Sequence, residues 1–512
     1  MNDWSYGYVT EVPYTYGYYA ELNPVRLILP FLFVSIMPPK IETACELGFG
    51  QGLSINIHAA ASNVEWWGTD FNLTQVSFAK ELADVSGANL HVFDESFEEF
   101  CERRDLPEFD FIGLHGVWSW VSPENQKIII NFIRKKLKVG GVVYISYNTL
   151  PGWLQMIPLR ELLAEYIDNI LAKGEKITDR INKAIDFAER FFETQPAYAK
   201  ANPQVLNRLK KIKNQNRNYL AHEYFNRDWS PIFFHHMAKT LSEAKLNFAC
   251  SASYIDHIEV VNLTKKQQEF LKKEGSNSIF SQLLRDFICN VQFRKDYWVK
   301  GIKRIDPFSR INQLRSLQVI AVAPLDSFEY TVSGLLGEAK LNESIYKPII
   351  EFLSDYKPKT ILQIEHVLKK KDISFIQILQ AIMILGAKGV INLVQNENTI
   401  SKVKRRVQRL NHYILQRSRS YGDINFLASP YTGGGISVGR FEQMFSLGYM
   451  QGKRLPEQLA DFTWNQLSAL NQRIIKDGKP IQSAEENLAE LKRMAEDFLN
   501  KKHRLLKSLS VL

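Results

Sequence analysis

Short apolar segments alternate with amphipathic ones over residues 41–147. The apolar segments show no polar alternation, which is typical of strands in a parallel sheet that is buried on both faces. The segments between them repeat apolar residues at helical spacing. This alternation predicts a doubly wound α/β domain of the Rossmann type. The predicted strands are residues 41–46, 65–69, 90–93, 109–114 and 142–147, and the predicted helices are residues 53–61, 73–86, 97–103 and 123–136.

The pattern changes after Pro151, beyond which helical periodicity dominates. An apolar segment at residues 246–252 interrupts it, and we expect this segment to return to the edge of the sheet. Residues 265–300 are predicted to be helical with one break. Residues 346–394 combine helices with a final apolar strand, the outline of a winged helix, and residues 484–507 form an amphipathic helix. The expected fold is therefore α/β, a Rossmann-like domain followed by mainly helical domains that include a winged-helix-like module.

A glycine-rich loop, ELGFGQG at residues 46–52, follows the first predicted strand. Glycines there let the backbone turn tightly and approach a ligand at the start of a helix. The spacing is G-x-G-x-G and not the G-x-G-x-x-G of dinucleotide-binding loops, and the carboxylate of Glu46 would repel a phosphate. A ligand with an ammonium and a sulfonium but no phosphate suits this loop, so S-adenosylmethionine is the expected cofactor. The predicted loop contacts are Glu46, Gly48, Phe49, Gly50 and Gly52.

Polar residues follow the next two predicted strands. Asp70 ends the second strand, where an acidic side chain can accept hydrogen bonds from both ribose hydroxyls, and Phe71 lies beside it. Asp94 and Ser96 follow the third strand, where a polar side chain can hold the adenine amino group. Ser96 is better aligned with the apolar residue that follows, whereas Asp94 is the better acceptor, so we retain both.

Aromatic residues follow the fourth predicted strand in HGVWSW, residues 115–120. Ligands bind beyond the carboxyl ends of the strands in such sheets, and aromatic faces attract cations. We therefore expect His115 to contact cofactor and substrate, and Trp118, ahead of Trp120, to border the methyl acceptor. The alternative is that both indoles pack in the core. The predicted catalytic residues are Tyr14, Tyr16, His115, Trp118 and Asn148, of which the tyrosines belong to a Tyr-rich segment that forms either a lid or a surface arm.

Other catalytic constellations are missing from the sequence. The pairs at residues 222–223 and 235–236 (His-Glu and His-His) lack the spacing of zinc sites, and we interpret them as structural. Methyl transfer requires alignment of the acceptor with the methyl group and an acceptor that has lost its proton. We expect no metal and no single indispensable base.

The 512-residue chain carries a formal net charge of +9, with a pI near 9.0. Such a charge favours acidic partners, but the basic residues are spread thinly, unlike those of nucleic-acid binders, so we expect no nucleic-acid partner. The four cysteines show no paired spacing, which indicates core thiols and a reducing compartment. No secretory signal pattern and no apolar run long enough to span a bilayer are present. We therefore expect a cytoplasmic protein.

In combination, these motifs resemble a bacterial family of class I S-adenosylmethionine-dependent methyltransferases that carry a methyltransferase regulatory domain. That family includes rickettsial protein-lysine methyltransferases, which act on outer-membrane surface proteins. The resemblance implies N-methylation of lysine side chains on a protein substrate, a homodimer, and an open substrate cavity between the domains. It rests on residues 46–52, Asp70, and residues 115–120, 147–153, 219–225, 234–252, 285–287, 293–301 and 427–430.

Together with this resemblance, the pattern predicts six segments. A methyltransferase of a small molecule, a glycan or a lipid would use the same aromatic cleft and is the alternative to a protein-lysine methyltransferase. Nucleic-acid binding by the winged-helix-like module is disfavoured because residues 375–385 contain no Lys or Arg. The predicted segments are 1–40 (Tyr-rich arm), 41–155 (S-adenosylmethionine-binding core), 156–215 (helical), 216–302 (regulatory domain), 303–395 (winged-helix-like) and 396–512 (mixed, with the terminal helix).

Overall fold

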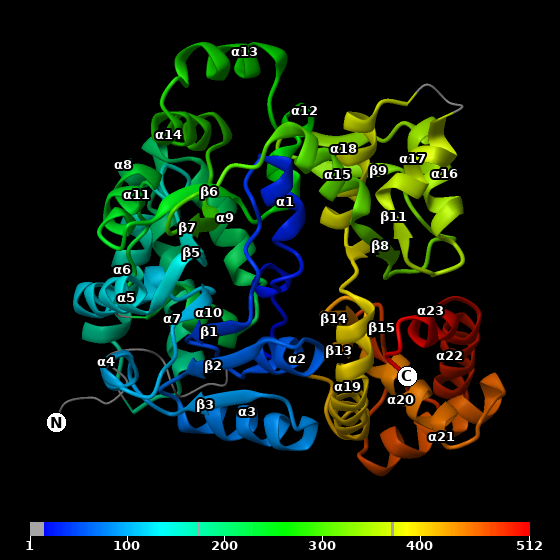
Figure 1. Ribbon diagram of the computed structural model, residues 1–512. Helices are drawn as coiled ribbons and strands as arrows, with labels where there is room; N and C mark the ends of the chain where they lie inside the picture. The colour runs from blue at the N-terminus through cyan, green and yellow to red at the C-terminus, as the bar shows by residue number, and fades with distance from the viewer. Residues whose placement is uncertain (1–14, 173, 227, 370–372) are drawn as a thin grey trace.

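A seven-stranded sheet with the strand order β3-β2-β1-β4-β5-β7-β6 forms the centre of the first half of the chain. The computed structural model describes residues 15–172, 174–226, 228–369 and 373–512 (Figure 1). Strands β1 to β5 are parallel, and β7 runs antiparallel between β5 and β6. The expected doubly wound α/β fold is confirmed. The strands are β1 (Thr43–Leu47), β2 (Glu65–Thr69), β3 (Leu90–Phe93), β4 (Phe109–Leu114), β5 (Leu137–Asn148), β6 (Asn247–Ser251) and β7 (Phe293–Val299).

Helices cover both faces of this sheet. On one face, α5 and α11 pack their apolar side chains, including Phe132 and Phe234, against β4 and β5. On the other face, α1, α2 and α3 supply a second apolar layer that includes Phe31 and Ile55. Ser122 caps α5 by accepting a hydrogen bond from the Asn125 amide, as its position before Pro123 predicts. The helices are α1 (Ile28–Phe33), α2 (Leu53–Ala61), α3 (Leu73–Ser86), α4 (Phe97–Glu102), α5 (Pro123–Lys136) and α11 (Phe234–Ser242).

The strand order reverses between β1 and β4. In open α/β sheets, a crevice forms at this reversal, beyond the carboxyl ends of the strands. The 46–52 loop after β1 and residues 115–120 after β4 flank that crevice. The sheet topology therefore brings together two of the motifs that the sequence singles out.

The prediction that residues 265–300 are helical throughout was wrong at its C-terminal end. Helices α13 (Lys265–Glu274) and α14 (Ser278–Cys289) form as expected, but Phe293–Val299 is strand β7. This strand pairs with β5 on one side and β6 on the other, but its charged residues Arg294 and Asp296 are not typical of a central strand. Their burial is compensated by the ion pair that they form with each other. The sheet edge itself is β6, within the apolar segment expected to return there.

A helical layer follows the core between β5 and β6. Its helices pack around a core of their own that includes Leu163, Ile181, Leu209 and Leu220. Helix α10 ends this layer. The helices are α6 (Ile157–Asn169), α7 (Ile177–Glu193), α8 (Ala197–Ala201), α9 (Gln204–Lys213) and α10 (Arg217–Tyr224), and the short α12 (Glu259–Asn262) follows β6.

The C-terminal half contains two further groups of elements, drawn from yellow-green to red in Figure 1. In the first, a small sheet β11-β8-β12 packs with helices α15 to α18, and β9 and β10 form a hairpin. Its members are α15 (Pro307–Ser316), β8 (Gln318–Ala321), β9 (Thr331–Gly334), β10 (Gly337–Lys340), α16 (Glu343–Leu353), β11 (Lys359–Thr360), α17 (Ile361–Leu368), α18 (Phe375–Ala387) and β12 (Ile391–Leu393).

In the second group, the long helix α19 (Glu397–Arg417) packs against α2 and α3 (Figure 1). The Tyr413 hydroxyl donates to the Glu81 carboxylate at 2.6 Å and ties the two halves of the chain together. The helix predicted at residues 484–507 is interrupted by a π-helical turn, Phe498–Lys502. The remaining elements are β13 (Phe426–Ser429), β14 (Gly434–Ser437), α20 (Arg440–Met450), α21 (Pro456–Ala469), β15 (Ile475–Lys476), β16 (Lys479–Pro480), α22 (Ala484–Asp497) and α23 (His503–Ser508).

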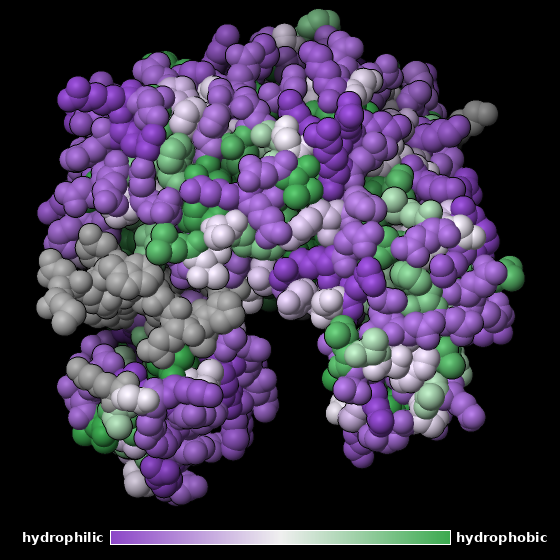
Figure 2. Space-filling view, turned by 90° about the horizontal axis from the view of Figure 1, so that it is seen from below, coloured by the Kyte–Doolittle hydropathy of each residue, from purple (hydrophilic) through white to green (hydrophobic). Residues whose placement is uncertain are grey.

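Hydrophilic residues cover most of the face shown in Figure 2, and an open hollow separates two lobes of the molecule there. Hydrophobic residues gather towards the middle of this face. Within the described part of the chain, no helix has the length and apolar character needed to cross a membrane.

Candidate functional site

The 46–52 loop turns through three glycines with left-handed backbone conformations, Gly48 (φ +71°), Gly50 (φ +58°) and Gly52 (φ +70°). A Cβ atom on Gly48 would lie 2.7 Å from a methyl group of Val117, and one on Gly52 would lie 2.5 Å from the Cβ of Ala79. The loop therefore needs glycine both for its conformation and for its close contacts.

Two carboxylates flank this loop. Glu46 is 2% exposed, and its Oε2 has no hydrogen-bond partner among the described residues. Burial, and next the charge of Asp70, raise the pKa of Glu46 to about 8. Asp70 accepts hydrogen bonds from the amides of Gly50 at 2.8 Å and Asn72 at 3.0 Å, and burial raises its pKa to about 6 despite them. A buried, unpartnered carboxylate is a ready acceptor for a cationic ligand.

A cavity of about 1060 Å³, including its open mouth, lies between this loop and α10; we call it the main cavity. Six of the residues predicted to bind the cofactor line it, namely Gly48, Gly50, Asp70, Phe71, Ser96 and His115. The described lining includes four carboxylates and no Lys or Arg. The remaining lining residues are Asn72, Gln75, Glu95, Phe97, Gly116, Val117, Trp120, Val121, Ser122, Asn125, His222, Glu223 and Asp228.

A small cavity of about 320 Å³ adjoins the main cavity and shares Gly48, Gly50 and His115 with it. Glu46, Phe49 and Gly52 line it, together with Thr15, Gly17, Tyr19, Gln51 and Leu53. The two cavities together thus place every predicted cofactor residue except Asp94 around one space. Asp94 instead lies 3.5 Å from Lys80 in a half-exposed ion pair, while Ser96 both lines the main cavity and caps α4.

His115 joins the two cavities. Its ring stacks on Tyr19, with 3.6 Å between the centroids and 21° between the planes, and its Nδ1 lies 2.8 Å from the Tyr144 hydroxyl. Burial lowers the pKa of His115 to about 3, so the imidazole is neutral at physiological pH. A neutral ring adds no positive charge to the wall of the main cavity.

The other predicted catalytic residues that the structure describes, Tyr16, Trp118 and Asn148, do not line the main cavity. Trp118 is fully buried in the core between the sheet and α5, whereas Trp120 lines the cavity. A 3-10 helix has three residues per turn, so side chains two positions apart point in different directions. Asn148 is buried, and its backbone bonds to Ser119 and Ile232. The expected order of the two tryptophans is therefore reversed.

The tyrosines of the N-terminal segment also separate. Tyr16 packs edge-on against Phe78, and the Arg417 side chain lies over its ring, so it contacts α3 and α19 and not the cavity. Tyr19 is the aromatic residue of this segment that reaches the 46–52 loop. Tyr14 lies outside the described residues.

Three lining residues of the main cavity come from beyond the predicted core of residues 41–155 and are not among the predicted site residues: His222, Glu223 and Asp228. His222 and Glu223 lie on α10, and burial raises the pKa of Glu223 to about 7. The adjacent His and Glu are the signal in the sequence for this part of the site, but without the spacing of a zinc site they indicate a structural role. Within the described residues, no cluster of three or more His, Cys, Asp or Glu side chains is arranged to hold a metal.

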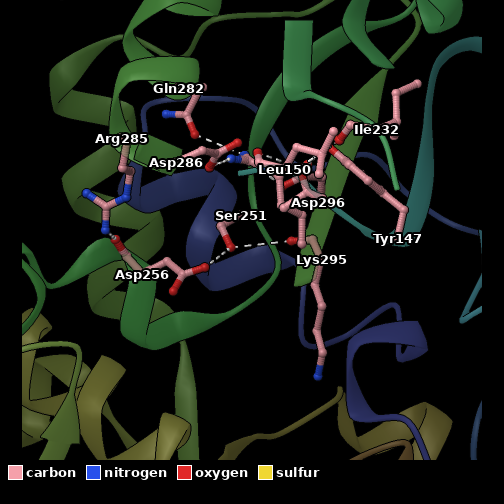
Figure 3. Close-up of polar contacts among 12 residues, drawn as sticks. Tyr147, Leu150, Ile232, Ser251, Asp256, Gln282, Arg285, Asp286, Lys295 and Asp296 are labelled. Atoms are coloured by element: carbon pink, nitrogen blue, oxygen red, sulfur yellow. Dashed lines mark hydrogen bonds and ion pairs between the residues drawn. The ribbon is translucent and has the colours of Figure 1, made fainter. Parts of the chain in front are cut away.

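A buried polar network joins the end of β5 to α14 and β7 (Figure 3). Arg294 pairs with Asp286 at 2.5 Å and with Asp296 at 2.8 Å, and Tyr147 donates to Asp296 at 2.8 Å. Gln282 accepts a further hydrogen bond from Arg294. We call these five residues the Arg294 network. The network holds β5, which ends at Asn148, against α14 and β7.

Comparisons with known proteins place these features in a family. Residues 216–300 match the family model described as a predicted methyltransferase regulatory domain. The protein sll1526 of Synechocystis sp. is 40% identical over 513 residues, which cover 99% of both chains. Protein RP789 of Rickettsia prowazekii is 27% identical over 295 residues, covering 56% of this chain and 51% of that protein.

The solved structure of PKMT2 from Rickettsia typhi in complex with AdoHcy has a similar fold. Its TM-score is 0.65 at 17% sequence identity, and the match covers 95% of this chain and 99% of that chain. A second structure of the same protein gives a TM-score of 0.66 at 18% identity. The sheet topology and the regulatory domain together define a class I methyltransferase fold with a methyltransferase regulatory domain. The chain belongs to the family of the Synechocystis protein sll1526.

Proposed function

We propose that the chain is a S-adenosylmethionine-dependent methyltransferase. The observation that carries this proposal is the charge of the main cavity, whose described lining contains Asp70, Glu95, Glu223 and Asp228 but no Lys or Arg. A pyrophosphate would find no cation there, whereas a sulfonium and an ammonium are attracted to such a wall. The unpartnered Oε2 of Glu46 and the Cβ-free cradle of the 46–52 loop fit the same ligand.

The residues present suit each part of the cofactor. Glu46 would accept the ammonium, Asp70 the ribose hydroxyls, and Ser96 would lie on the adenine side. When bound, S-adenosylmethionine supplies a methyl carbon for a nucleophile. The chain itself contributes the wall of the site. In that wall the rings of His115 and Tyr19 stack and exclude water. The indole of Trp120 lines the main cavity.

We further propose a protein-lysine acceptor, on a bacterial surface protein before its export, and a cytoplasmic homodimer as the acting form. The support is the sequence resemblance to protein-lysine methyltransferases together with the acidic cavity, which suits an amine. Sedimentation of the purified protein tests the dimer.

Calorimetry with S-adenosylhomocysteine and with NAD tests the cofactor. Binding of the former alone is the expected result, and binding of NAD alone contradicts the proposal. Transfer of a labelled methyl group in the presence of candidate surface proteins tests the acceptor. Label on lysine is expected, whereas label on a low-mass product would assign the enzyme to a small molecule, glycan or lipid.

A further inference from the structure

Helix α10 belongs to the segment that matches the regulatory domain, yet it forms part of the wall of the main cavity. The opposite part of the wall is the 46–52 loop of the core, represented by Gly48 and Gly50. The cavity is therefore incomplete without the regulatory domain. In the sequence, strands β2 to β5 and helices α6 to α9 separate the 46–52 loop from α10, so only the fold brings the two walls together.

We propose that Glu223 is the catalytic residue that binds the acceptor amine and takes its proton, so that the regulatory domain completes the active site. This inference rests on the proposed methyltransferase function. Glu223 reaches the main cavity from α10, and no ion pair or hydrogen bond joins its carboxylate to another described residue. Trp120 lines the same cavity, and its ring centroid lies 6.2 Å from that of Trp229. The cavity therefore offers an aromatic face as well as the carboxylate to a cation.

An ammonium donates its proton to the Glu223 carboxylate and becomes a neutral amine with a free electron pair. That pair forms the new N–C bond to the methyl group while the electrons of the breaking C–S bond stay on sulfur. The methylated nitrogen carries the positive charge, and Glu223 releases its proton to solvent through the cavity mouth.

The environment of Glu223 supports this role. Burial holds its pKa near 7, where a general base is effective at neutral pH. No described Lys or Arg of the cavity lining competes with the substrate amine for the carboxylate. The titratable and charged groups around Glu223 are Asp70, Glu95, His115, His222 and Asp228 in the cavity, Tyr219 and Tyr224 on α10, and Arg208 of α9, which bonds to Tyr224.

The test compares Glu223→Gln with the wild-type protein and with Glu269→Gln, an exposed carboxylate of α13, as the matched control. Calorimetry with S-adenosylhomocysteine comes first. All three proteins are expected to bind it, because Glu46, Asp70 and Ser96, which would hold the cofactor, are unchanged in the variants. The probe for the amine is N-acetyl-lysine methylamide, titrated into protein saturated with S-adenosylhomocysteine, with the norleucine analogue as the uncharged comparison. Glu223→Gln is expected to bind the lysine probe about tenfold or more weakly, and the control variant normally.

The pH profile separates a base from a structural residue. The wild-type methylation rate is expected to rise with pH through an apparent pKa near 7. In Glu223→Gln this rise near pH 7 is lost, and the rate falls by about 10²–10⁴-fold. The rate of the variant recovers only at the higher pH where the amine deprotonates by itself. Glu223→Asp is expected to restore part of the rise near pH 7. If Glu223→Gln does not fold, the wild-type protein alone provides the test. Binding of the lysine probe must release protons, which makes the measured binding enthalpy depend on the buffer. Binding of the norleucine probe must not release protons.

Normal amine binding and an unchanged pH profile in Glu223→Gln would overturn the inference while leaving the methyltransferase proposal intact. Failure of the wild-type protein to bind S-adenosylhomocysteine would instead overturn the proposed function, and the inference with it.

Discussion

The phenol ring of Tyr19 lies against the imidazole of His115, with 3.6 Å between the ring centroids. This contact connects the N-terminal segment to the end of β4, at the wall shared by the two cavities. Tyr19→Ala is expected to admit water to His115, so the pKa of the histidine should rise from about 3 toward its ordinary value of 6.5. NMR titration measures this, with the signal assigned by a His115→Gln variant.

Tyr16→Ala is the matched control, because Tyr16 packs against Phe78 and Arg417 at a distance from the cavities. It should leave the His115 titration unchanged. An unchanged titration in Tyr19→Ala as well would show that the sheet, and not the N-terminal segment, excludes water from His115.

Glu46 makes the stability of the ligand-free protein depend on pH. Its pKa is about 8 in the folded protein against 4.5 in the unfolded chain, so the folded state holds a proton that the unfolded state has released within this window. The contribution of Glu46 to the free energy of unfolding is therefore fully present below the unfolded-state pKa of 4.5, and it is lost as the pH rises to the folded-state pKa of about 8. Denaturant titrations near pH 4.5 and near pH 8 should show that the wild-type protein loses more stability than Glu46→Gln as the pH rises between these values. Parallel behaviour of the two proteins would mean that Glu46 is ionised when folded.

The sequence predicted what depends on local pattern. Near-continuous apolar runs predict β2, β3 and β4 at the bounds that the structure has, and the glycine spacing locates the 46–52 loop. Prediction from the sequence failed for polar residues that are buried by contacts with residues distant in the chain. Strand β7 was hidden because Arg294 and Asp296 look like surface residues until Asp286 and Tyr147 surround them. Glu223 was missed for a related reason, since its place opposite the loop depends on how a later domain docks.

The Arg294 network is expected to support the junction between β5 and the regulatory domain. Arg294→Met leaves the Asp286 and Asp296 carboxylates buried without their cation, and breaking such a pair costs about 3–5 kcal/mol. The shift in the urea midpoint measures it. Lys213→Met, which removes an exposed pair with Glu189, should barely move the midpoint because solvent screens that pair. Equal shifts in the two variants would show that the network contributes no more than a surface pair.

Gly48 combines two constraints that substitutions can separate. Alanine at a left-handed position costs about 1–2 kcal/mol through backbone strain alone, and Gly140→Ala, at φ +85° with no atom within 4 Å of the new Cβ, isolates that cost. At Gly48 the new Cβ also lies 2.7 Å from a Val117 methyl group, so the loop or Val117 must shift. If the loop shifts, affinity for S-adenosylhomocysteine should fall by about tenfold or more. Gly140→Ala should bind the ligand normally.

The double variant Gly48→Ala/Val117→Ala completes this comparison, because it removes the methyl group that the new Cβ meets while keeping the backbone strain. Recovery of calorimetric affinity, without recovery of stability, is the expected result and would show that close packing against Val117 sets the loop's position. If the double variant binds as weakly as Gly48→Ala, then the left-handed conformation itself, and not the contact with Val117, governs the loop's ability to hold its ligand.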